Sequence, residues 1–197
     1  MTITDLKRYL AILKNKILKS EIEIGKSDGN AKTIIPEYKV TAVIPNYNYA
    51  RYLQERLDSI LFQTYPVAEV IILDDCSKDN SIEVIQRLIE ENKSGIPIKF
   101  IPNEKNSGSV FAQWQKAFEM AAYDYVWIAE ADDSCNEHFL ETVMQGFCNP
   151  DVVISYCESL TIDEKNKLLA FAKGDLIYLF NFSPDASPTD FFVPAHI

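Results

Sequence analysis

The sequence has no uninterrupted apolar run near the length of about 20 residues that a membrane-spanning helix needs. It also lacks the apolar core of a secretion signal, because Lys and Arg side chains interrupt the first 20 residues. We therefore expect a cytoplasmic protein. No segment repeats at a fixed period, which argues against a repeat architecture.

Cysteine is scarce and lacks the spacing of a zinc site. The sequence has no C-x-x-C pair, and only Cys135 has a histidine, His138, close to it along the chain. We expect reduced thiols with no part in the chemistry. The four cysteines are Cys76, Cys135, Cys148 and Cys157.

Basic residues are fewer than acidic residues. Against 29 Asp and Glu there are 19 Lys and Arg, so the net charge at pH 7 is −10. This excess repels a phosphate backbone, and nucleic-acid binding is not expected. Residues 1–20 are the exception: their net charge of +4 leaves −14 on the remaining 177 residues. An acidic body can still bind a phosphorylated small molecule if a divalent cation or backbone amides neutralise it.

Residues 1–36 are expected to form a basic amphipathic helix and a linker. Within residues 3–20 the apolar side chains recur at helical spacing, and the other face is basic. The apolar stripe consists of Leu6, Leu10, Leu13 and Ile17. Two interpretations stay open: residues 1–20 dock on the body or on a partner domain, or they contact the inner face of a membrane. A polar, glycine-containing stretch ending at Pro36 is typical of a linker.

From residue 37 onward, apolar runs of strand length alternate with helical periods. This alternation predicts an α/β fold, with a mostly parallel sheet sandwiched by helices. The expected strands are 40–44, 70–73, 98–101, 125–129 and 151–156. The expected helices follow the first four strands, around 53–61, 82–89, 110–121 and 139–147. The periodicity weakens after residue 160, and residues 181–197 are expected to form a loop.

Polar residues follow the expected strands at the sheet edge where parallel sheets bind ligands. Five carboxylates arrive there from two strands, in the segments Asp74-Asp75 and Glu130-Ala131-Asp132-Asp133. Helix capping alone would explain Asp79 or Asp133. Clustered like charges cost free energy unless a cation or ligand offsets them, so we expect Mg²⁺ or Mn²⁺ held by one or two carboxylates and by ligand phosphates.

Two further residues at this edge suit a nucleotide. Tyr47 follows a strand end and a proline turn, where its ring can form a wall of a flat pocket; core packing is the alternative. Gly108 lies in a turn that opens a helix, where free amides can approach an anion. Trp114 and Tyr125 are most simply core residues.

Four ordered segments resemble the nucleotide-binding half of a family 2 glycosyltransferase with the Rossmann-like GT-A fold. They are most similar to bacterial enzymes that build surface polysaccharides. The segments are VTAVIPNYNYARYLQERLDSILFQTYP, VIILDDCSKDNS, NEKNSGSVFAQW and YVWIAEADD. The resemblance covers roughly residues 38–160. It implies a nucleotide-sugar-binding domain over residues 37–160 and an incomplete acceptor-binding region over residues 161–197.

The resemblance also implies roles for the strand-end residues. Pro45 and Tyr47, on either side of Asn46, would pack against the base of a nucleoside diphosphate sugar. Asp75 would hydrogen-bond the base, with Asp74 holding the loop. The segment Glu130-Ala131-Asp132 corresponds to the D-x-D motif, whose last acid would ligate the metal.

The sequence departs from the family pattern at three places. Glu130 replaces the first Asp of D-x-D, which makes its contact with ribose or metal less certain than that of Asp132. An arginine frequent in the family is replaced near Gln113 and Trp114. Glu137 stands where a proline is common after the motif.

The implied activity is sugar transfer from a nucleoside diphosphate sugar to a hydroxyl of a glycan or lipid-linked acceptor, inverting and metal-dependent. The general base of such enzymes comes from the acceptor-binding half. Asp163, Glu164 and Asp175 look like surface loop acids, so the base is unidentified and expected beyond residue 197. We therefore expect this chain to bind a nucleotide sugar but to transfer poorly alone.

Two other classes of protein are weighed against this interpretation. A signalling receiver module needs its acid pair after the first strand, which here ends in Pro45-Asn46-Tyr47. A non-catalytic nucleotide-binding or assembly module of a larger protein is the stronger alternative, with residues 1–20 as its docking element.

Overall fold

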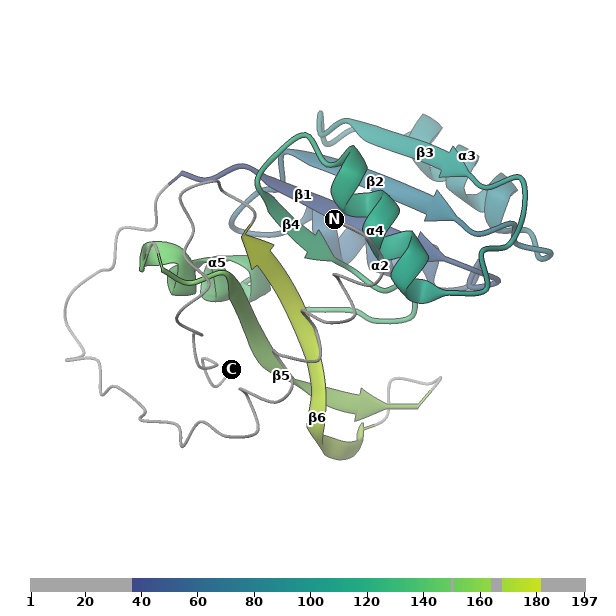
Figure 1. Cartoon of the computed structure of the whole chain (residues 1–197). Coiled ribbons are helices and arrows are strands. Elements are labelled where there is room, and N and C mark those ends of the chain that lie inside the picture. The colour runs from purple at the N-terminus through teal and green to yellow at the C-terminus, as the bar shows by residue number, and fades with distance from the viewer. Residues whose placement is uncertain (1–36, 150, 164–167, 182–197) are drawn as a thin grey trace.

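The computed structural model describes residues 37–149, 151–163 and 168–181, which contain one six-stranded sheet in the order β3-β2-β1-β4-β6-β5. Figure 1 shows the sheet and its helices. The strands are β1 (Val40–Asn46), β2 (Glu69–Asp74), β3 (Ile98–Pro102), β4 (Tyr125–Ile128), β5 (Ile154–Ile162) and β6 (Leu168–Asn181). The helices are α2 (Leu53–Leu61), α3 (Ser81–Glu91), α4 (Val110–Met120), α5 (Phe139–Met144) and the 3-10 helix η1 (Gln145–Cys148).

The first four strands are parallel, as the alternation predicts. β1 pairs with β2 on one side and with β4 on the other, and β2 pairs with β3. Every residue of β1, β2 and β4 is buried. A strand covered on both faces reads as a continuous apolar run, which is why these strands could be located from the sequence.

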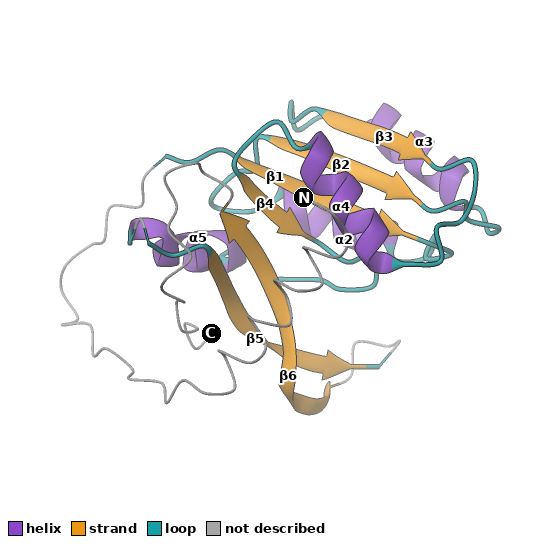
Figure 2. Cartoon of the chain, in the orientation of Figure 1, coloured by secondary structure: helices purple, strands orange, loops and turns teal. Residues whose placement is uncertain are grey.

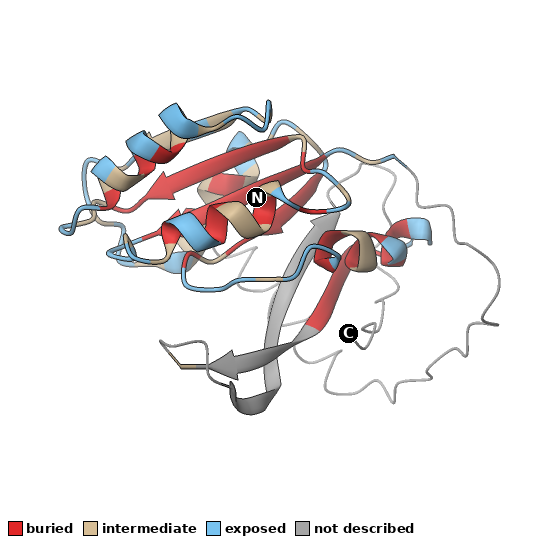
Figure 3. Cartoon of the chain, turned by 180° about the vertical axis from the view of Figure 1, so that it is seen from behind, coloured by how far each residue is buried: buried red, intermediate tan, exposed pale blue. Residues whose placement is uncertain are grey.

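Helices cover both faces of the parallel strands. α2, α3 and α5 place their apolar residues in the larger core cluster, and α4 packs on the opposite face through Ala117, Trp114 and Phe118. Figure 2 shows α4 in front of the sheet and α2 and α3 behind it. Figure 3, seen from behind, shows buried strands beneath α2 and α3, whose outer faces are exposed. The α/β sandwich is thus confirmed.

The chain after α5 differs from the expectation. The strand expected at 151–156 is β5, which begins at Ile154 and ends at Ile162. β5 pairs antiparallel with β6, and β6 pairs antiparallel with β4. β6 was not expected, because Lys173, Gly174 and Asp175 interrupt its apolar pattern. Asp175 therefore lies in a strand and not in a loop.

Several expectations are untested. The expected domain boundary at residue 160 falls inside β5, and the division there stays a prediction. The expected helix at 3–20, Glu164 and residues 182–197 lie outside the described residues. No described helix combines the length and apolar character needed to cross a membrane.

Glu69 at the start of β2 is a buried acid held by three donors. Thr41 Oγ1 donates to Glu69 Oε1 at 2.8 Å, the Ala122 amide donates at 2.7 Å, and Lys99 Nζ lies 2.7 Å from Oε2. Burial alone would raise the pKa of Glu69. The hydrogen bonds outweigh burial, so its pKa lies below the usual value of 4.5.

We predict that Glu69→Gln destabilises the protein by about 1–2 kcal/mol at pH 7, because it weakens the charged hydrogen bonds. A lowered folded-state pKa stabilises the fold above the unfolded pKa, and this stabilisation is lost as the pH falls below 4.5. The difference between wild type and Glu69→Gln should therefore shrink at pH 3.5. Urea unfolding at both pH values tests this, with the exposed Glu119→Gln as control. An equal difference at both pH values would contradict it.

Candidate active site

Side-chain hydrogen bonds join the loops that follow the two central strands. Asn46 Nδ2 donates to Asp74 Oδ2 at 2.8 Å, and Ser77 Oγ donates to the same oxygen at 2.6 Å. The Asn48 amide donates to Ser77 Oγ at 2.9 Å, and the Lys78 amide donates to Asn48 Oδ1 at 2.7 Å. Asp74 is 0% exposed. Its carboxylate thus holds the two loops together.

Asp75, the next residue, is fixed by neutral donors. Its Oδ1 accepts hydrogen bonds from Asn103 Nδ2 at 2.7 Å, the Ser107 amide at 2.9 Å and Gln113 Nε2 at 2.9 Å. Its Oδ2 accepts from Ser107 Oγ at 2.8 Å. Only 6% of Asp75 is exposed, and the residue lines a pocket. Its carboxylate is therefore held in one orientation at the pocket wall.

The pocket has a volume of about 400 Å³ and lies beyond the carboxyl ends of β1, β2 and β4. Six residues expected from the sequence line it: Pro45, Asn46, Tyr47, Asp75, Gly108 and Glu130. Tyr49, Asn106, Ser109, Val110 and Gln113 complete the lining. Asp74, Ala131 and Asp132 do not line it. The volume is within the range of small-molecule sites.

Two acceptor atoms of the pocket lining are buried without a partner. They are Asn46 Oδ1 and Gln113 Oε1, on residues that are 2% and 4% exposed. An unpaired buried acceptor costs free energy.

The acidic segment after β4 is at the other side of the pocket. Glu130 is partly buried, and its Oε1 accepts a hydrogen bond from Trp114 Nε1 at 2.8 Å. Burial raises the pKa of Glu130 to about 7; the charges of Asp132 and Asp133 add to the rise, and the Trp114 hydrogen bond opposes it. Asp132 is exposed, whereas the side chain of Ala131 is buried in the core.

The donor chemistry of this segment suits a hard divalent cation. Magnesium is commonly held by one or two carboxylates together with ligand phosphates, and Asp132 with Glu130 supplies such oxygens. Tyr49 lies close to Asp132. The negative charge of Asp132 raises the pKa of the Tyr49 hydroxyl, and burial and a hydrogen bond to Asp132 add to the rise. Neutral donors instead satisfy Asp74 and Asp75. Among the described residues, no three acidic, histidine or cysteine side chains form a metal-binding group. The five strand-end carboxylates therefore do not act as one cluster.

A buried arginine lies behind the acidic segment. Arg56 of α2 is 0% exposed, with its guanidinium 5.1 Å from the Trp127 ring centre. Its Nη1 lies 3.8 Å from Cys135 Sγ. Burial lowers the pKa of Arg56, and the negative charges of Asp133 and Glu130 oppose that shift. Cys135 is a free thiol, as expected, but it contacts this cation.

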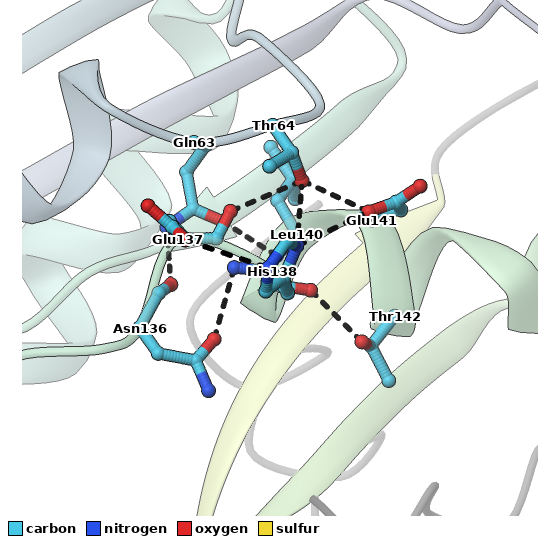
Figure 4. A network of polar contacts seen from close by, with 8 residues as sticks. All are labelled: Gln63, Thr64, Asn136, Glu137, His138, Leu140, Glu141 and Thr142. Carbon is cyan, nitrogen blue, oxygen red and sulfur yellow. Dashed lines mark hydrogen bonds and ion pairs between the residues drawn. The ribbon is translucent and has the colours of Figure 1, made fainter.

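The segment that follows the acids is fastened to the end of α2 (Figure 4). Gln63 Nε2 donates to the Asn136 carbonyl at 2.6 Å, and Gln63 Oε1 accepts from the Leu140 amide at 2.7 Å. The Thr64 amide donates to the Glu137 carbonyl at 2.8 Å. Glu137 thus contributes its backbone carbonyl to the attachment.

Sequence reasoning missed several site residues. Trp114 was expected to be a core residue; it packs on the core but also binds Glu130. Tyr125 is a core residue as expected and stacks on Tyr38 with ring centres 4.4 Å apart. The burial of Arg56 could have been predicted from the sequence, because Arg56 falls on the apolar face of α2, three residues after Leu53. No pattern in the sequence indicated that Tyr49 lines the pocket.

The comparisons agree with this geometry. Residues 41–189, more than half of the chain, match the family model Glycosyl transferase family 2. The chain therefore belongs to this family. Its four parallel strands flanked by helices form the GT-A arrangement of the family.

One curated relative and two solved structures show how far the similarity extends. An uncharacterized glycosyltransferase of Nostoc sp. is 37% identical over 115 residues, which are 58% of this chain and 34% of that protein. S. aureus TarS 1–349 in complex with UDP has a TM-score of 0.51 at 24% identity over 59% of this chain and 34% of that chain. The mannosyltransferase PcManGT from Pyrobaculum calidifontis, in complex with GDP-Man and Mn²⁺, has a TM-score of 0.60 at 20% identity over 91% of this chain and 54% of that chain. At these identities the two structures show the fold. The chain spans about a third of the Nostoc protein.

We predict that Glu130 makes stability fall as the pH rises. Its usual pKa is 4.5 and its pKa in the fold is about 7, so between these values the native state binds more protons than the unfolded state. Wild type should lose about 2 kcal/mol, relative to Glu130→Gln, between pH 5 and pH 8. Urea unfolding at the two pH values measures this. Equal pH dependence in both proteins would contradict the prediction.

Proposed function

We propose that this chain carries the donor site of a glycosyltransferase that moves a sugar from a nucleoside diphosphate sugar to an acceptor hydroxyl, with inversion and with Mg²⁺ or Mn²⁺. The observation that supports this best is the pocket at the ends of β1, β2 and β4. It has a fixed carboxylate, Asp75, and a half-exposed aromatic ring, Tyr47, near the acidic segment Glu130–Asp132.

The base of the nucleotide fits the side of the pocket formed by Asp75. The side chain of Tyr47 is 40% exposed and offers an aromatic surface for stacking. Asp75 Oδ2 accepts only the Ser107 hydroxyl among the described contacts, so it can accept a further N–H from a base. Asp74 acts through the loops it holds.

The diphosphate fits the side of the pocket formed by Glu130, with Asp132 two residues further along the chain. Asp132 would hold the metal, with Glu130 as a second ligand. The bound cation would stabilise the negative charge that develops on the leaving diphosphate. Gly108, in the loop before α4, also lines this pocket and has a φ of +65°, a backbone conformation that favours glycine.

We assign donor binding to residues 37–160 and the beginning of an acceptor-binding region to residues 161–197. The TarS and PcManGT structures contain UDP and GDP-Man, which supports a nucleotide-linked donor. TarS is a poly(ribitol-phosphate) beta-N-acetylglucosaminyltransferase, which supports a glycan-type acceptor for this chain as well. Surface-polysaccharide synthesis at the cytoplasmic side is the proposed setting. The general base that deprotonates the acceptor hydroxyl is proposed to come from the acceptor-binding region.

Calorimetric titration tests the metal assignment. We expect one of UDP, GDP, TDP or CDP to bind wild type more tightly with Mn²⁺ than without it. Asp132→Ala should weaken the Mn²⁺-dependent affinity at least tenfold, which is about 1.4 kcal/mol or more. Asp124→Asn, an exposed acid at the opposite end of β4, is the control and should bind like wild type. If none of the four nucleotides binds folded wild type, the donor-site proposal fails.

The base-side assignment is tested through Gln113. Gln113→Ala removes a donor that fixes Asp75, and we expect nucleotide affinity to fall about tenfold with and without Mn²⁺. Gln115→Ala alters a residue of the same helix that bonds Glu119 and does not line the pocket, and it should leave affinity unchanged. If Gln113→Ala and Gln115→Ala bind the nucleotide with the same affinity, the assignment of the base to this side of the pocket is contradicted.

A further inference from the structure

A second surface, on the outer side of α2, is not used by the proposed reaction. Its centre is Phe62, which directly follows α2 and is 73% exposed. Two grooves of about 500 Å³ and 340 Å³ meet at Phe62. Three residues line both grooves: Phe62, Gln54 and Asp58. We call the residues that line these two grooves the α2 surface.

The α2 surface combines apolar area with negative charge. Leu57, Leu61 and Leu88 line the smaller groove beside Phe62, but Leu57 and Leu88 are almost fully buried, so the large exposed apolar residue of this surface is Phe62. Four acids line the two grooves against two basic residues, Arg51 and Lys93. The acids are Glu55, Asp58, Glu91 and Glu137. Of these, Glu91 pairs with Arg87 at 2.9 Å, and Glu137 Oε1 lies 3.5 Å from His138 Nε2. An occupant of this surface should therefore be both apolar and basic.

Residues 3–20 of the same chain have this chemistry. Residues 1–20 carry a net charge of +4, and an apolar stripe recurs at helical spacing along them. In a helix the stripe of Leu6, Leu10, Leu13 and Ile17 would face Phe62. The neighbouring lysines would then lie near the acidic rim of the grooves.

The described chain begins close to this surface. The Tyr65 hydroxyl donates to the Tyr38 carbonyl at 2.6 Å, and Tyr65 lies three residues after Phe62. Residues 21–36 connect the basic segment to this point. A random-coil chain of 16 residues would span roughly 20 Å on average, more than the length of α2, about 14 Å for nine residues. The linker is therefore long enough to let residues 3–20 reach Phe62.

We propose that residues 3–20 dock within the same chain on the α2 surface. The apolar stripe covers Phe62, and the lysines pair with Glu55, Asp58 and Glu137. This inference is independent of the proposed reaction, because the surface is formed by residues that do not line the donor pocket.

Carbodiimide cross-linking of the full chain tests the proposal, because this reagent joins Lys amines directly to carboxylates that are already in contact. We mix ¹⁴N- and ¹⁵N-labelled chains and identify the cross-links by mass spectrometry. A cross-link within one chain joins two peptides that carry the same nitrogen isotope. We expect such cross-links from Lys7, Lys14 or Lys16 to Glu55, Asp58 or Glu137. Cross-links of mixed mass would instead show docking on a second copy and overturn the proposal.

Matched variants separate docking from chance collisions. Phe62→Ser and Leu13→Ser should each reduce the cross-link yield at least fivefold. Met120→Ser, at an exposed residue of α4 on the opposite face of the sheet, and Ile12→Ser, outside the apolar stripe, should not. Circular dichroism of each variant confirms folding. Equal yields in all four variants would overturn the proposal.

Vesicles distinguish a membrane as the occupant. Wild type is incubated with vesicles of phosphatidylglycerol and phosphatidylcholine and then centrifuged by flotation. Docking predicts that the cross-links persist and that little protein floats. Flotation of most of the protein, with loss of the cross-links, would assign residues 3–20 to a membrane surface. Absence of both cross-links and flotation would also overturn the proposal.

Discussion

The site depends on the buried hydrogen bond between Asn46 and Asp74, the last residues of the two central strands. The two residues are paired in the register of β1 and β2, and their side chains are 2.8 Å apart. The bond fixes where both loops leave the sheet, so Tyr47 and Asp75 face one pocket. A buried carboxylate is costly unless its oxygens are satisfied, and Asn46 with Ser77 meets this condition for Asp74.

The carboxylates of the site lie in three different environments. Neutral donors surround Asp74 and Asp75, so neither needs a cation to remain buried. Glu130 is partly protonated near neutral pH, because its pKa is about 7. Asp132 is exposed and keeps its contact with water. The acidic segment after β4 is therefore the part of the site where a bound cation would change the electrostatics most.

Much of the fold and the positions of the site residues could be predicted from the sequence. Buried parallel strands give continuous apolar runs, and the residues that follow them must reach one edge of the sheet, which located Tyr47, Asp75 and Glu130. The side-chain partners could not be predicted, because they depend on packing between distant elements: Gln113 meets Asp75 across 38 positions of sequence. β6 was missed although residues 168–172 and 176–180 are apolar runs of strand length, because Lys173, Gly174 and Asp175 separate them.

Two adjacent residues of α4 connect the two sides of the pocket. Gln113 and Trp114 are adjacent on α4, and they bond Asp75 and Glu130 respectively, so a single helix connects both sides of the pocket. The side chain of Glu130 is one methylene longer than that of an aspartate, and it spans the distance to Trp114 Nε1. A movement of α4 would therefore displace the hydrogen-bond partners of Asp75 and Glu130 together.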